Sequence, residues 1–257
     1  MRVHHRIAGA GEGLLLVNSL GAALELWEPQ VAALAAHHRL VRYDQRGHGA
    51  TPAPQGPYTV ETLAGDALEL LDSLGLERVS VCGLSMGGAV ATWLAANARD
   101  RVDRLVIASA GTRFATPEMW RERAAAVRAG GTEAVVDAVL GRWFTPVFAA
   151  ARPDVVAAFR ATFCAVQREG YAGCCEALAE WDASFHLARI GAPTLVISGS
   201  DDSVAPPDQG RAIADGIAGS RFVLLDDCAH LASAGQPEAF TAAVLDHLTA
   251  PGARTRA

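Results

Sequence analysis

Apolar runs of strand length alternate with amphipathic stretches along the first half of the chain. The runs that predict strands are residues 3–7, 14–18, 38–44, 79–83 and 104–110. Apolar side chains recur at helical spacing between Thr59 and Leu74, and a second helix is expected from Met86 to Asn97. This alternation predicts an α/β fold, with a mostly parallel sheet and helices on both of its faces.

The alternation stops in the middle of the chain. No strand pattern occurs from Phe114 to Ala188, where Ala and Arg are frequent and the periodicity is helical. The elements expected beyond this stretch are strands at 194–199 and 221–226 and helices at 208–217 and 236–248. We therefore expect a helical cap, residues 114–188, inserted into one α/β core made of residues 1–113 and 189–257.

Composition narrows the choice of partners. Apolar residues make up 51% of the 257 residues, enough for a sizeable core. No run reaches the roughly 18–20 apolar residues that a membrane span needs. No apolar stretch follows the N-terminal MRVHHR, so we expect no secretory signal and a cytoplasmic location. The net charge of −6 and the scattered basic residues argue against a nucleic-acid partner.

Cysteine and lysine usage excludes several kinds of chemistry. The five cysteines are odd in number and form no C-x-x-C pair, which favours free thiols over disulfides or a zinc site. All 22 basic residues are arginines. The chain therefore has no lysine for a Schiff base or a P-loop, and a cation that binds a carboxylate must be an arginine or a protonated histidine.

A candidate nucleophile lies between a predicted strand and a predicted helix. Residues 83–87 read GLSMG, which matches G-x-S-x-G in the strand–turn–helix context that makes this motif meaningful. Such a turn exposes the serine hydroxyl and admits only glycine where neighbouring chain segments approach closely. Ser85 is thus predicted to be a nucleophile, and the alternative is a serine that merely caps a helix.

A serine needs a base, and His230 is in a suitable place. It follows the last predicted strand, and the ends of parallel strands gather at one edge of a sheet. Asp201 and Asp202 follow the strand at 194–199 and reach the same edge, so either could orient the imidazole. Asp226 and Asp227 are nearer to His230 in sequence, but this proximity does not place a carboxylate against the ring.

The remaining requirement is a pair of N–H groups for the developing oxyanion. One is expected from Met86, the residue after the serine. The other is expected from Leu20, in the loop NSLG that follows an early strand. Both would act through the backbone.

Four segments resemble, in order, those of the α/β-hydrolase superfamily: NSLG at 18–21, DQRGHG at 44–49, GLSMGG at 83–88 and GSDD at 199–202. The family also has its serine, acid and histidine in this order. It places the acid three residues after the strand-end glycine, which implies Asp202 rather than Asp201. The resemblance covers nearly the whole chain and implies that residues 114–188 form a lid or cap.

Part of the pattern resembles one branch of this superfamily, the 3-oxoadipate enol-lactonases of the β-ketoadipate pathway of aromatic catabolism. Most superfamily members have His-Gly where this chain has Asn18-Ser19. The shared segments are NSLG, RYDQRGHG, and, in the cap, TPEMWRERAAAVR and GRWFTP. The resemblance implies that the partner is a small five-membered enol lactone with a carboxymethyl group. It implies no metal and no other cofactor.

A substrate carboxylate would need an arginine in this lysine-free chain. Arg142, beside Trp143 in the cap, is the first candidate, and Arg113 is the second. Both arginines could equally be solvated surface residues. Trp143 could shield the site from water or simply pack within the cap.

Fold and triad do not select one substrate, because function depends on the pocket. A broader carboxylesterase, or a cofactor-free haloperoxidase-like hydrolase with the same triad, is the main alternative. A non-catalytic ligand-binding protein on the same fold is a third. The sequence pattern does not predict the oligomeric state.

Overall fold

The computed structural model describes residues 1–250, so the end of the predicted third segment, residues 251–257, lies outside the described residues. A seven-stranded sheet has the order β1-β3-β2-β4-β5-β6-β7. Its strands are β1 (His5–Ala8), β2 (Gly13–Val17), β3 (Arg39–Tyr43), β4 (Val79–Leu84), β5 (Val102–Ala108), β6 (Thr194–Gly199) and β7 (Arg221–Leu225). The edge strand β1 pairs antiparallel with β3, and the other pairs are parallel. The predicted mostly parallel sheet is confirmed.

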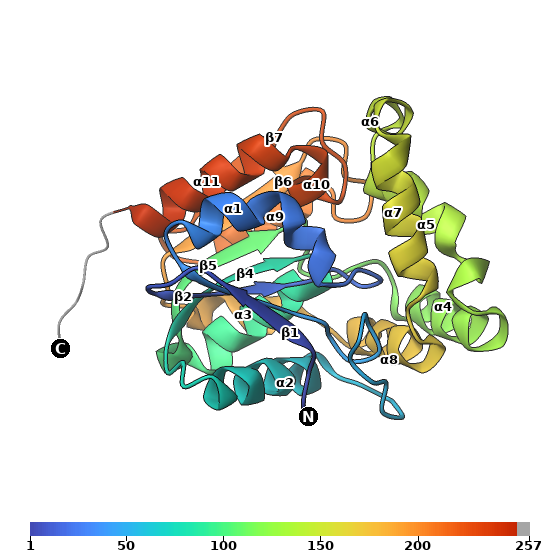
Figure 1. The fold of residues 1–257 in the computed structure, drawn as a ribbon, viewed down its shortest axis with the longest axis horizontal. Coiled ribbons are helices and arrows are strands. Elements are labelled where there is room, and N and C mark those ends of the chain that lie inside the picture. Colours follow the sequence, from blue (N-terminus) through green and yellow to red (C-terminus); the bar gives the residue numbers. More distant parts are fainter. Residues whose placement is uncertain (251–257) are drawn as a thin grey trace.

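Helices cover both faces of the sheet, as the alternation predicts. Helix α1 (Glu28–Ala35) packs with α11 (Pro237–Thr249), and α2 (Val60–Ser73) packs with α3 (Met86–Asn97). Figure 1 shows the first pair on one side of the strands and the second pair on the other. Helix α9 (Pro207–Gly216) contacts β6 and β7. Helices α1 and the short α10 (Ala232–Gly235) are not among the predicted helices.

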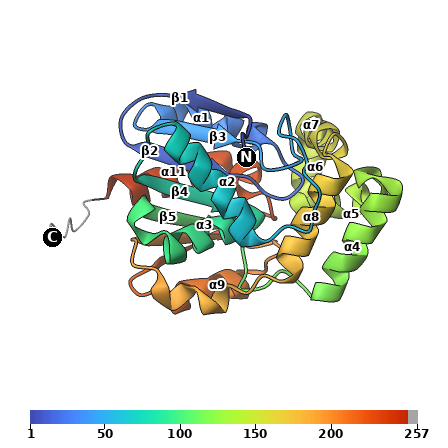
Figure 2. The ribbon, with the colours of Figure 1, turned by 90° about the horizontal axis from the view of Figure 1, so that it is seen from below.

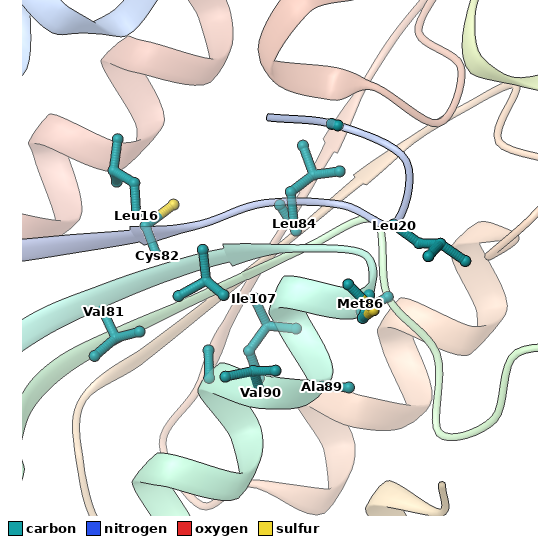
Figure 3. Packing of buried hydrophobic residues seen from close by; sticks show 14 of the residues in the cluster. Leu16, Leu20, Val81, Cys82, Leu84, Met86, Ala89, Val90 and Ile107 are labelled. Carbon is teal, nitrogen blue, oxygen red and sulfur yellow. The ribbon is translucent and has the colours of Figure 1, made fainter. Parts of the chain in front are cut away.

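The core is fully buried where β4 leads into α3. Strand β4 is buried along its whole length, and so are the first seven residues of α3. Figure 3 shows Val81 on the face of β4 that is turned toward this helix, where Val90 also lies, and Leu84 on the opposite face. A turn held on all sides in this way can keep a residue in a costly backbone conformation.

The segment between β5 and β6 is helical. Its helices are α4 (Pro117–Gly130), α5 (Val136–Trp143), α6 (Pro146–Ala151), α7 (Pro153–Cys164) and α8 (Arg168–Ala179), which we call the cap helices. Short 3-10 turns are Leu24–Trp27, Arg99–Arg101, Thr132–Ala134, Ala183–Phe185 and Leu187–Arg189. Figures 1 and 2 both show the cap helices together at one end of the sheet. None of the helices in residues 1–250 has the length and apolarity to cross a membrane.

Proline and threonine define where several cap helices begin. Pro117, Pro146 and Pro153 occupy first-turn positions, where a missing N–H costs nothing. Thr116 and Thr145 stand just before two of these helices and accept hydrogen bonds from backbone N–H groups of the first turn. The local sequence thus divides the cap into short helices.

Candidate active site

The turn from β4 to α3 holds Ser85 in a strained conformation. Its φ of 58° and ψ of −116° are values that residues with a side chain rarely adopt. A Cβ atom on Gly83 would strike the backbone of Gly87, and one on Gly87 would strike the carbonyl group of Val17. Glycine is therefore needed on both sides of the serine, which explains the spacing of the motif.

The hydroxyl of Ser85 lies against His230. Its Oγ atom is 2.8 Å from Nε2 of His230, and Nδ1 of His230 is 2.9 Å from Oδ2 of Asp202. Because an ionised carboxylate only accepts hydrogen bonds, Nδ1 carries the proton and Nε2 is left to accept from the serine. The structure thus brings together the three side chains that the sequence predicts to act in catalysis.

Asp202, not Asp201, faces the imidazole. Oδ1 of Asp202 accepts hydrogen bonds from the N–H groups of Val204 (2.8 Å) and Ala205 (3.0 Å), so this carboxylate is fixed at both oxygens. Asp201 is exposed and accepts a hydrogen bond from the Ser200 hydroxyl at 2.7 Å. The geometry agrees with the position implied by the family resemblance.

Leu20 and Met86 lie at adjoining turns. Figure 3 places Leu20 in the loop after β2 and Met86 at the start of α3. The two turns are in close contact, since the Cα of Gly87 fits against the carbonyl group of Val17. Within residues 1–250, neither the Leu20 nor the Met86 N–H group donates a hydrogen bond to another protein group. Both N–H groups thus lack a protein acceptor, as the predicted oxyanion role requires.

Side chains from the neighbouring loop hold the turn at 18–21 in place. The side chain of Asn18 donates to the carbonyl group of Tyr43 at 2.8 Å, and Gln45 donates to the carbonyl group of Asn18 at 2.7 Å. The N–H of Gly21 donates to Nε2 of His48 at 3.0 Å. Burial lowers the pKa of His48, which favours the neutral ring that this acceptor role requires.

Ser85 and His230 line a cavity of about 90 Å³. The cap provides much of its wall, including Trp120, Arg123 and Tyr171. Drug-sized ligands usually occupy several hundred Å³, so this cavity suits a small metabolite.

The structure separates the two arginines that the sequence offers for a substrate carboxylate. Arg142 and Trp143 both line the cavity. Arg113 does not: its guanidinium is half-exposed and pairs with Asp182 at 2.6 Å. Arg113 thus lies outside the cavity wall and already has a carboxylate partner, so the structure favours Arg142 over Arg113 as the cation for a substrate carboxylate. Trp143 also packs edge-on against Phe163, with ring centres 5.6 Å apart.

Arg123 and Tyr171 line the cavity but are not among the predicted site residues. Whether these two side chains point into the cavity depends on how α4 and α8 pack together, and no local sequence pattern determines this packing. A weak signal exists on α4, where the spacing of Met119 and Arg123 puts both on one helix face.

The α/β hydrolase fold family matches residues 13–236, which is most of the chain. The chain belongs to this family. The expectation drawn from the four motifs is thereby confirmed, and this α/β hydrolase can be compared with named relatives. It is 36% identical over 231 residues to 3-oxoadipate enol-lactonase 2 of Acinetobacter baylyi strain ADP1, covering 90% of this chain and 86% of that protein.

Two solved structures extend the comparison. The crystal structure of the enol-lactonase from Burkholderia xenovorans LB400 is 45% identical with a TM-score of 0.94, covering 96% of each chain. A thermophilic esterase from Thermogutta terrifontis, described with malate bound, is 30% identical with a TM-score of 0.92, covering 96% of this chain and 92% of that one. The resemblance to enol-lactonases thus extends over nearly the whole α/β hydrolase.

Proposed function

We propose that this α/β hydrolase is a serine hydrolase that opens 3-oxoadipate enol-lactone to 3-oxoadipate. The observation that carries the proposal is the relay from Asp202 through His230 to Ser85, which opens into a small cavity lined by the cap. The similarity to two enol-lactonases supports the choice of substrate.

In the proposed reaction, Ser85 attacks the lactone carbonyl carbon while His230 takes the hydroxyl proton. The N–H groups of Leu20 and Met86 stabilise the tetrahedral oxyanion. Its collapse breaks the ring C–O bond, and the imidazolium protonates the departing enolate oxygen. The enol then tautomerises to a ketone, which makes ring closure unfavourable.

The second half of the reaction releases the product. His230 takes a proton from water, and the hydroxide attacks the acyl-enzyme carbonyl carbon in the same oxyanion site. Collapse returns the proton to Ser85 and frees the second carboxylate of 3-oxoadipate. The carboxymethyl group would lie toward the cap, where Arg142 supplies a cation.

A direct assay tests this proposal. The ultraviolet absorbance of the enol lactone should fall when the protein is added, and Ser85→Ala should lower the rate on the order of 10⁴-fold or more. Faster turnover of neutral p-nitrophenyl esters than of the lactone would favour a carboxylesterase instead, the second candidate that the Thermogutta relative supports. A folded protein whose Ser85 resists a fluorophosphonate probe would point to a ligand-binding protein without hydrolase activity.

A further inference from the structure

Two arginines in the cavity have no counter-ion. Within residues 1–250, neither Arg123 nor Arg142 forms an ion pair, although both line the cavity with Ser85. Four other arginines of the 114–188 segment are paired with carboxylates, namely Arg121, Arg128, Arg152 and Arg160, and the remaining one, Arg168, is exposed to solvent. Leaving two guanidiniums uncompensated in a partly buried site costs free energy unless an anion joins them.

The two guanidiniums lie close enough to affect each other. Burial, and then the charge of Arg123, lower the pKa of Arg142. Arg123 stacks over the ring of Trp120 with its Cζ atom 4.7 Å from the ring centre, and Nε of Arg142 donates to the carbonyl group of Ala138 at 3.1 Å. These contacts hold both side chains in place, which lowers the entropic cost of binding a ligand.

A tyrosine completes the group. Tyr171 of α8 is buried, lines the same cavity and lies beside both arginines. Burial raises the pKa of its hydroxyl, while Arg123 and Arg142 oppose this with a weaker effect. The hydroxyl therefore stays protonated at neutral pH and can donate to an anion.

We propose that Arg123, Arg142 and Tyr171 form a carboxylate-binding subsite in the cavity that Ser85 also lines. The substrate class is then carboxylic esters and lactones whose acyl portion ends in a second carboxylate. A guanidinium binds a carboxylate with two N–H groups, so the two arginines can hold both oxygens. This inference rests on the proposed function and deepens it. It requires the substrate to carry a second carboxylate, away from the ester that reacts, for efficient turnover.

A matched pair of esters tests the subsite. Mono-p-nitrophenyl adipate and p-nitrophenyl hexanoate have acyl chains of equal carbon number, and only the first ends in a carboxylate. The wild type should prefer the adipate ester. Arg123→Gln and Arg142→Gln should each lower kcat/KM for it about 10- to 100-fold, the range for a lost charged hydrogen bond, and change hexanoate turnover little. Tyr171→Phe should cause a smaller loss.

Arg121→Gln provides the control. Arg121 lies on α4 near Arg123, but it is exposed and pairs with Glu180 outside the cavity. This variant removes the same charge from the same helix and should keep the preference for the adipate ester. Arg123 has no ion pair to lose, only its stacking on Trp120, so Arg123→Gln should change the melting temperature little. Equal losses on both esters in the cavity variants, or an equal loss in the control, would overturn the subsite.

Binding without turnover separates this inference from the proposed function. Calorimetry of adipate with Ser85→Ala should show binding that disappears when Arg123→Gln is added and remains when Arg121→Gln is added. If the enol lactone is not a substrate while adipate binding follows this pattern, the subsite stands and the lactone assignment fails. If adipate binds equally well in all three proteins, or in none, the subsite fails whatever the lactone assay gives.

Discussion

At the residue scale, His48 contacts the backbone of the oxyanion turn rather than the proposed reacting groups. Its Nδ1 donates to the carbonyl group of Arg46 at 2.9 Å, so its Nε2 is an acceptor and takes the N–H of Gly21. Gly21 adjoins Leu20, whose N–H is the proposed oxyanion donor. The orientation of that donor therefore depends on a neutral imidazole that the substrate does not touch.

Replacing His48 tests this positioning role. His48→Phe leaves the buried N–H of Gly21 without an acceptor, which costs about 1–3 kcal/mol. We expect kcat for a neutral ester to fall about 10-fold with little change in KM, because the oxyanion forms only in the transition state. Steady-state kinetics would measure both constants.

His48→Gln serves as the conservative variant. Its side-chain oxygen can still accept a hydrogen bond, so part of the lost kcat should return. A lower melting temperature in His48→Phe together with an unchanged kcat would show that His48 contributes only to stability.

The sequence predicts the Ser-His-Asp triad better than it predicts the residues that line the cavity. Ser85, Asp202 and His230 stand at strand ends, and a parallel sheet brings strand ends together whatever the details of packing. The cap has no such constraint. Arg113 and Arg123 have the same chemistry, and only the packing of the cap helices leaves one with Asp182 and the other in the cavity.

At the element scale, one loop joins the oxyanion turn to the cap. The loop at 44–51 holds the turn through Gln45 and His48, while Gly47 packs directly on Gly170 of α8. Gln167, just before α8, donates from its N–H to the carbonyl group of Gly47 at 2.9 Å. The position of α8 is therefore tied to the geometry of the active site.

Two glycines of the cap helices should respond in opposite ways to alanine. A Cβ on Gly170 would strike Gly47, so Gly170→Ala should lower both the melting temperature and kcat. Gly141 of α5 has open space around its Cβ position, so Gly141→Ala should stabilise by about 0.5–1 kcal/mol through helix propensity. Thermal denaturation of both variants checks this. Equal shifts would mean that the contact with the loop is not tight.

Helix α1 shows why one element escapes sequence prediction. Its buried positions include Gln30, whose amide donates to the carbonyl group of Ser233 at 2.8 Å. A polar residue on the buried face breaks the apolar periodicity from which helices are predicted. The hydrogen bond that offsets the cost of burying Gln30 is made to Ser233, which is far away in sequence. No local pattern therefore reveals it.

At the scale of the whole molecule, three buried histidines and one partly buried histidine set a lower pH limit on stability. Burial is the main cause that lowers the pKa of His38, His48, His186 and His247. The unfolded chain then binds more protons than the folded one as the pH falls below about 6.5. The stability that these groups contribute is complete above that pH and is lost as the pH falls toward their lower folded values.

We therefore expect the melting temperature to drop between pH 7.5 and 5.5, before most carboxylates titrate. His38 offers a test, because neither of its ring nitrogens has a hydrogen-bond partner among the described residues. His38→Leu should make the drop less steep, whereas the same change at its exposed neighbour His37 should not. Parallel curves for wild type and His38→Leu would contradict this explanation.

The division of the cavity between core and cap has a consequence for how such proteins diversify. In the proposed reaction, the core supplies the serine that attacks the ester carbonyl, while the cap supplies the arginines proposed to select a carboxylated substrate. Evolution, or a protein engineer, could exchange the inserted helices between relatives and obtain a new selectivity on an unchanged reactive centre. The exchanged helices would dock correctly only if small residues were kept where Gly47 of the core loop contacts Gly170 of α8. This contact joins the core to the cap.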